Sequence, residues 1–253
     1  MADSYFKYTP SVWIVPSFFL GIIWSVFGVE YFYDLDFTEY GIYPRQWMGL
    51  KGIILSPFIH GDLSHIFNNS IPLFLLIAAM VYFYRNVSLK VIFYGILFSG
   101  MLTWLIGRES YHIGASGLIY VLVSFIFFKG IQTRYYRLVA LSLTIVVLYG
   151  GMIWYVFPTV DAGISWEGHL SGFLAGFVFT YLFKTPNYKR ELRYDWEKEE
   201  FDDSQDLFMK HFDENGNFVE LPKDETEELT IQNESHLSVQ IKYEYKQADE
   251  KTD

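Results

Sequence analysis

Six long, mostly apolar stretches follow one another through the first three quarters of the chain. They cover residues 12–29, 65–84, 90–107, 115–130, 136–157 and 167–184. A helix of about 20 apolar residues spans the hydrocarbon core of a bilayer. Because the apolar side chains lie all round each predicted helix, burying six of them in water would need a much larger protein. The sequence therefore predicts an all-α membrane protein with six transmembrane helices. We expect the first to be retained, because it lacks the basic leader and small-residue cleavage site of a signal peptide.

The charged residues divide the chain into two parts. Residues 1–190 carry a net charge of +3, whereas residues 191–253 carry 20 acidic side chains against 7 basic ones. We therefore expect a six-span domain over 1–190 and an acidic segment over 191–253, whose partner the sequence does not identify. No part of the chain has the basic stripe that binding to nucleic acid requires. The absence of cysteine from the sequence excludes disulfides, zinc–thiolate sites and cysteine nucleophiles.

Lysine and arginine residues near the predicted spans indicate which side of the membrane each loop faces. With the N-terminus in the cytoplasm, only Arg45, Lys51 and Arg108 lie outside. Ten lie inside: Lys7, Arg85, Lys90, Lys129, Arg134, Arg137, Lys184, Lys189, Arg190 and Arg193. This asymmetry predicts cytoplasmic N- and C-termini.

Two segments outside the predicted spans have a character of their own. Residues 30–64 are too long for a simple connector and carry several aromatic side chains, so we expect a short amphipathic element in the outer interface. In the acidic segment, Asn215 and Gly216 form a hairpin-turn signal, and residues 237–243 alternate like a half-buried strand. This composition fits either a small β-containing module or a disordered tail.

Four polar side chains fall at the outer ends of predicted spans, where such groups are costly unless they function or pair. They are His65, Asn69, Ser116 and His169. Under the predicted orientation they can meet in one layer.

Ser116 lies between glycines in Gly114-Ala115-Ser116-Gly117, just before an apolar run. Glycine permits a tight turn and the close approach of a substrate chain, and a helix start offers free N–H groups to a developing negative charge. A string of this kind in a membrane helix is also typical of a small-residue packing contact. Taken alone, it leaves both interpretations open.

His169 follows Gly168 at the top of a face on which Gly168, Gly172 and Gly176 recur every four residues. Such a face lets a neighbouring helix approach closely. An imidazole brought against Ser116 could accept its proton, which a serine hydroxyl needs to lose in order to act as a nucleophile. A histidine hydrogen-bonded inside the bundle is the alternative interpretation.

His65 and Asn69 are four residues apart and point to one face of the second stretch, where both could donate to an oxyanion. His60 and Asp62 stand nearby, so metal binding is the rival interpretation. The spacing of His60 and His65 does not match the helical pair of zinc ligands four residues apart. We therefore predict no metal site and no cofactor.

Three motifs together resemble those of rhomboid intramembrane serine proteases of the bacterial six-span kind. They are His60-x-x-x-x-His65-x-x-x-Asn69, Gly114-x-Ser116-Gly117 with Tyr120 one turn later, and Gly168-His169-x-x-x-Gly172. They occur in this order on the second, fourth and sixth predicted spans. With the span count and loop order, the resemblance covers nearly all of residues 1–185.

The resemblance implies a fold, an activity and roles. It implies a rhomboid-like bundle in which Ser116 is the nucleophile and His169 the general base of a dyad without an acidic third member. Tyr120 would stack on the imidazole. His65, Asn69 and the backbone N–H of Ser116 would form the oxyanion hole. Transmembrane protein substrates would pass the fifth span and the loop at about residues 158–166, and would be cut near the outer face of a bacterial inner membrane.

One departure from the family concerns the first loop. The family often has a Trp-Arg pair eight to nine residues before the first histidine, where this chain has Lys51 and Gly52. Trp47 and Arg45 lie out of register, which leaves the conformation of this loop open.

Two other classes of protein were weighed against a protease. A rhomboid-like adaptor that binds membrane clients without cutting them is the main rival, but such relatives typically lack the serine or the histidine. A transporter is disfavoured, because its polar groups should form a path through the bilayer, whereas these all lie in the outer half.

Overall fold

The computed structural model describes residues 6–158, 163–186, 188, 194, 201–202, 206 and 208–220. Contacts divide the chain into two units, Met1–Arg190 and Glu191–Asp253, and each is described by itself. The helices of the first unit are α1 (Ser11–Tyr33), η1 (Thr38–Tyr40), η2 (Trp47–Lys51), α2 (Gly52–Leu55), η3 (Ser56–Phe58), α3 (Leu63–Phe83), α4 (Ser88–Ile106), α5 (Ser116–Thr133), α6 (Tyr136–Tyr149), η4 (Gly150–Val156) and α7 (Trp166–Leu182). The described residues form no β-strand, so the predicted all-α class is confirmed.

In the part of the chain that the structure describes, five segments are long and apolar enough to cross a bilayer. They are α1, α3, α4, α5 and the continuous stretch Tyr136–Val156, which joins α6 to η4. Helix α7 has 17 residues, or about 25 Å at 1.5 Å per residue, which is the lower limit for a span. It corresponds to the sixth predicted stretch.

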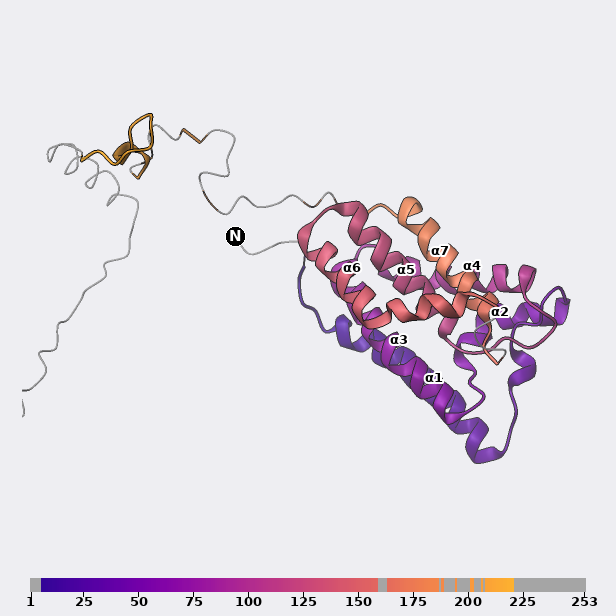
Figure 1. Ribbon diagram of the computed structural model, residues 1–253. Coiled ribbons are helices and arrows are strands. Elements are labelled where there is room, and N and C mark those ends of the chain that lie inside the picture. Colours follow the sequence, from indigo (N-terminus) through magenta and orange to yellow (C-terminus); the bar gives the residue numbers. More distant parts are fainter. Residues whose placement is uncertain are drawn as a thin grey trace, which may run out of the picture. The chain divides into compact units, whose positions relative to one another are not determined.

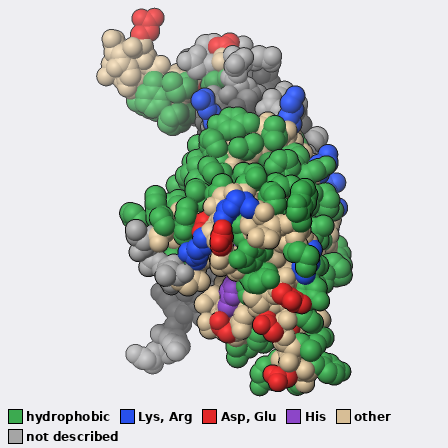
Figure 2. All heavy atoms as spheres, turned by 90° about the vertical axis from the view of Figure 1, so that its right-hand side faces the viewer, with side chains coloured by type: hydrophobic (Ala, Val, Ile, Leu, Met, Phe, Trp, Pro, Cys, Tyr) green, Lys and Arg blue, Asp and Glu red, His purple; other side chains and the backbone are tan. Residues whose placement is uncertain are grey.

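The surface of the first unit is strongly apolar. Large side chains such as Phe18, Ile71 and Val147 are 65%, 65% and 82% exposed. Hydrophobic side chains cover much of the face drawn in Figure 2, and charged side chains lie near its centre, in its lower part and along its edges. Water would penalise so much exposed apolar surface, whereas lipid tails solvate it. The chain is an integral membrane protein.

Helix α5 lies at the centre of the bundle, in contact with α3, α4, α6 and α7, while α1 packs along α3 (Figure 1). The side chains of α5 are buried on several faces, which include Ile119, Leu122, Phe125 and Ile126. An apolar helix without a polar face needs neighbours or lipid all round, and α5 finds neighbours. Its first residue, Ser116, is thus fixed to the most enclosed element of the fold.

The loop between α1 and α3 is a series of short helical turns rather than one amphipathic element. Trp47 is 85% exposed and takes no part in the core. Arg45 turns back to the end of α4, where its Nη1 donates to the carbonyl of Gly107 at 2.6 Å. Gly52 packs against the backbone of Gly41 so closely that a Cβ atom would lie 2.1 Å from the Gly41 carbonyl carbon. A bulky side chain could not occupy position 52 in this loop.

In the second unit, the predicted turn at Asn215 and Gly216 is present. Phe212 and Phe218 form an isolated antiparallel bridge around it. Gly216 has a φ of +80°, and the carboxylate of Asp213 accepts hydrogen bonds from the backbone N–H groups of Asn215 and Asn217. A short 3₁₀ turn, η7 (Met209–His211), precedes it. The predicted strand at residues 237–243 lies outside the described residues.

Candidate active site

Ser116 is the first residue of α5 and is half-buried. The turn before it depends on Gly114, whose φ of +102° is rarely adopted by other residues. A Cβ atom on Gly114 would lie 2.5 Å from Nε2 of His65. Since the first four N–H groups of a helix have no intrahelical acceptor, the backbone N–H of Ser116 is free of the α5 ladder.

His169 lies in the first turn of α7 and is 7% exposed. Its ring stacks on Tyr120 of α5, with centroids 4.3 Å apart and planes 17° from parallel. Its Nδ1 lies 3.0 Å from the carbonyl oxygen of Tyr155 in η4. Because a carbonyl only accepts, Nδ1 carries the hydrogen, and a neutral ring then presents Nε2 as an acceptor. Tyr120 is itself held, since its hydroxyl donates to the carbonyl of Met152 at 2.6 Å.

A seam of glycines brings α5 and α7 together. A Cβ atom on Gly172 would lie 2.2 Å from the carbonyl oxygen of Gly117, and one on Gly176 would lie 2.3 Å from that of Val121. Near the top, a Cβ on Gly117 would lie 3.6 Å from the carbonyl oxygen of Gly168. The backbones approach this closely only because side chains are missing. The seam places the start of α5 beside the start of α7.

His65 and Asn69 reach the same place from α3. Both side chains lie against Gly114, as a Cβ atom there would be 2.5 Å from His65 and 3.4 Å from Nδ2 of Asn69. Asn69 is buried, and its Nδ2 has no hydrogen-bond partner among the described residues. Asp62 caps α3 by accepting the backbone N–H of His65 at 2.8 Å. An unused buried donor beside Ser116 is available to a ligand.

His60 supports the turn from behind. It is 2% exposed, and its Nε2 accepts a hydrogen bond from the backbone N–H of Ala115 at 3.5 Å. Its ring lies 4.9 Å from that of His65, centroid to centroid. Burial lowers the pKa of His60 to about 4, so the ring is neutral at physiological pH. His60 therefore contacts the site through the backbone before Ser116.

One open cavity of about 930 Å³ unites the predicted side chains. Its lining includes His65, Asn69, Ser116, Tyr120 and His169. Ser116 and His169 make no hydrogen bond to each other in the structure. Catalytic pairs are often loosely aligned until substrate binds. The remaining predicted residues, Gly114, Gly117, Gly168, Gly172 and His60, shape the backbone around the cavity rather than line it.

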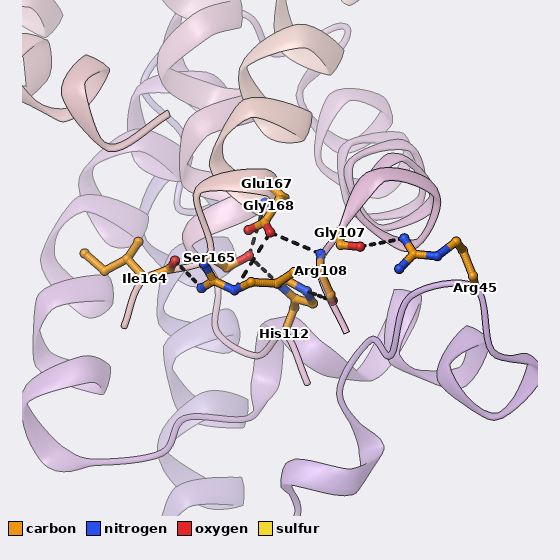
Figure 3. A network of polar contacts seen from close by, with 8 residues as sticks. All are labelled: Arg45, Gly107, Arg108, His112, Ile164, Ser165, Glu167 and Gly168. Carbon is orange, nitrogen blue, oxygen red and sulfur yellow. Dashed lines mark hydrogen bonds and ion pairs between the residues drawn. The ribbon is translucent and has the colours of Figure 1, made fainter. Parts of the chain in front are cut away.

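A second polar group was missed by sequence reasoning. Arg108, His112, Ser165 and Glu167 form a network beside the cavity, drawn in Figure 3. Glu167 is 1% exposed although it carries a carboxylate. The signal that could have revealed it is an acidic residue at the start of an otherwise apolar stretch, with arginine in a facing loop.

Comparison with known proteins gives the family. A family model described as the Rhomboid domain matches residues 45–186, more than half of the chain. The chain is a member of the rhomboid family. All three motifs described above lie inside this range.

Several individual proteins are similar to the chain, and one of them is named as a rhomboid. An uncharacterised protein of Mycobacterium tuberculosis is 35% identical to this rhomboid over 159 residues, which are 59% of this chain and 65% of the relative. A Mycobacterium leprae protein is 32% identical over 150 residues, 55% of this chain and 59% of the relative. A protein of Acanthamoeba polyphaga mimivirus that is named as a rhomboid protein is 30% identical over 138 residues, 53% of this chain and 75% of the relative. The chain thus spans less than two thirds of the length of the mycobacterial relatives.

Proposed function

We propose that this rhomboid is an intramembrane serine endopeptidase that cuts transmembrane proteins near the outer face of the bilayer. The observation that carries the proposal is the setting of His169. Its Nδ1 is engaged by the carbonyl of Tyr155, and Tyr120 fixes the plane of the ring. The nitrogen left to accept a proton is Nε2, in the cavity that Ser116 also lines. A serine hydroxyl needs such an acceptor to become a nucleophile.

The reaction follows from these positions. Oγ of Ser116 attacks the scissile carbonyl while Nε2 of His169 takes its proton. The negative oxygen that forms is stabilised by the backbone N–H of Ser116 and by the side chains of His65 and Asn69. The protonated imidazole then gives its proton to the leaving amine, and water repeats the sequence on the acyl-enzyme. No metal or cofactor has a role in these steps.

Labelling with a fluorophosphonate probe tests the proposal. The probe reacts covalently with an activated serine, so the protein in membranes should be labelled and Ser116→Ala should not. The same pair should differ in cleavage of a model transmembrane substrate. Absence of both labelling and cleavage in folded wild-type protein would favour a rhomboid-like protein that binds membrane clients without cutting them.

The proposed orientation places both termini in the cytoplasm of a bacterium and the cavity toward the outside. Since the chain lacks cysteine, single cysteines report accessibility cleanly. Glu109, with a side chain 78% exposed, is suited to the outer position, and exposed Glu214 to the inner one. An impermeant thiol reagent added to intact cells should modify Glu109→Cys and spare Glu214→Cys. The reverse labelling pattern would show that the protein has the opposite orientation in the membrane.

A further inference from the structure

Two chain segments beside the cavity are joined by several hydrogen bonds and one ion pair. One segment, residues 107–115, leads from α4 to Ser116, and the other, residues 163–168, leads to His169. Figure 3 shows the side chains that connect them. Each segment ends directly before a group proposed to react: residue 115 precedes Ser116, and residue 168 precedes His169. Whatever fixes the segments therefore also fixes those groups.

Glu167 and Arg108 make the first connection. Oε1 of Glu167 accepts the backbone N–H of Arg108 at 3.1 Å and lies 3.8 Å from Nε of the same residue. Nη2 of Arg108 also donates to the carbonyl of Ile164 at 2.7 Å. Arg108 therefore contacts the second segment at two points, Ile164 and Glu167.

His112 and Ser165 make the second connection. Nε2 of His112 lies 3.1 Å from the carbonyl oxygen of Arg108, so this nitrogen carries the hydrogen. Nδ1 is then an acceptor for the Ser165 hydroxyl at 2.6 Å. The Ser165 oxygen accepts in turn from the backbone N–H of Gly168 at 3.2 Å, which caps α7. Burial lowers the pKa of His112, which favours the neutral ring that this chain of bonds requires.

A purely stabilising role explains this arrangement poorly. Burying a carboxylate costs free energy that a single ion pair seldom returns, and apolar residues of similar volume often serve stability as well. Oε2 of Glu167 has no hydrogen-bond partner among the described residues, which adds to that cost. The network instead fixes relative positions, because it connects Glu167 at the start of α7 to the loop that leads to Ser116.

We propose that Glu167 is a positioning residue, which acts with Arg108, His112 and Ser165 to hold His169 in register with Ser116. The inference rests on the proposed protease function. A displacement of about 1 Å in a catalytic group can cost about a hundredfold in rate. Loss of the Glu167 contact should therefore lower turnover while substrate binding is preserved.

Kinetics of purified variants on a transmembrane substrate test the inference. Glu167→Ala should lower kcat by about 10- to 100-fold with KM unchanged within about twofold. Glu167→Gln keeps an oxygen that can accept the Arg108 N–H, so it should recover part of kcat. Ser165→Ala should lower kcat as Glu167→Ala does, and Ser165→Thr, which keeps the hydroxyl, should have a kcat close to the wild-type value. Glu109→Gln is the matched control, because that neighbouring carboxylate is exposed and contacts Arg45 rather than α7, at 3.9 Å.

Two further measurements, made beside kcat, separate the possible outcomes. Fluorophosphonate titration counts competent Ser116 sites, and thermal melting in detergent reports folding. A lower kcat per titrated site in protein that melts near the wild-type temperature supports positioning. A wild-type kcat per site in both Glu167 variants, or a loss that only follows the number of folded molecules, overturns it. Failure of the wild-type protein itself to label or cleave overturns the protease function instead.

Discussion

Two of the neighbours of helix α5, α6 and α7, differ in where along their lengths they pack closely against it. The backbones of α5 and α7 approach closely at the cavity end, where Gly172 contacts Gly117, and further along the helices, where Gly176 contacts Val121. Helices α5 and α6 approach closely at the opposite end, where a Cβ atom on Gly130 would lie 2.1 Å from Oγ of Ser142. The last buried residue of α6 is Ile145.

This difference indicates how one bundle can hold the groups proposed to react rigidly and still offer a cavity. Ser116 and His169 lie at the closed seam. Beyond Ile145, α6 continues into η4, whose residues Met152 and Tyr155 line the cavity and accept hydrogen bonds from Tyr120 and His169 through their backbone carbonyls. Backbone acceptors can orient a ring without filling the space in front of it. The predictions below test whether the two sides really differ in this way.

The largest effect is expected from Ser116 and His169, the two groups proposed to react. Ser116→Ala and His169→Ala should each lower turnover by at least about 10³-fold, and the double variant should be no worse than either single one. A nucleophile without its base, or a base without its nucleophile, gains nothing from the partner that remains. Cleavage of a model transmembrane substrate in proteoliposomes measures this. Multiplying losses in the double variant would mean that the two residues act separately.

The next effect concerns the donors that α3 presents to the same point. His65→Ala and Asn69→Ala should each lower kcat by about 10²–10³-fold, the range for loss of one oxyanion donor. Asn69→Asp tests charge, because it replaces a donor with an acceptor in a nearly equal volume. Chelators should leave the wild-type rate unchanged. If zinc restored activity after chelation, His60 and His65 would have to be read as metal ligands.

A smaller effect on stability should follow from closing the glycine gap. Gly172→Ala places a methyl group against the carbonyl of Gly117, and overpacking of this kind costs about 1–3 kcal/mol of unfolding free energy. Gly28→Ala is the matched control, because nothing lies within 4 Å of a Cβ atom there. Alanine favours helix over glycine, so the control should be neutral or slightly stabilising. Equal melting temperatures for the two variants would contradict the tight seam.

Much of this fold could be predicted from sequence, because lipid requires each span to be apolar over a length that the bilayer sets. The six stretches and the helices that form from them differ at their ends by a few residues, as between 12–29 and Ser11–Tyr33. Candidate site residues could also be proposed from sequence, since Gly114, Ser116 and His169 stand out in apolar surroundings. Their spans then needed only to be neighbours to bring them together.

The rest could not be predicted, because it depends on partners distant in sequence. The sequence places Arg108 in a loop outside the spans, and nothing local indicates that it reaches Glu167, 59 residues later. The first loop has no periodicity, and its path follows from contacts such as Arg45 with Gly107. Lys51 and Gly52 stand where the family often has a Trp-Arg pair, and the close approach of Gly41 leaves no room for a side chain at position 52.

The smallest effect is expected on the part of α6 that leaves α5. Val147 and Leu148 are 82% and 60% exposed, so Val147→Ala and Leu148→Ala remove methyl groups that contact lipid rather than protein. Each should change the free energy of unfolding by no more than about 0.5 kcal/mol, as for other exposed positions. Their kcat should stay at the wild-type value, since neither side chain lines the cavity. Unfolding in a detergent series measures the first quantity and substrate cleavage the second. A loss of more than about 1 kcal/mol of unfolding free energy would show that this face packs against another helix in the membrane. The difference between the α6 and α7 sides of α5 would then hold only for the isolated chain.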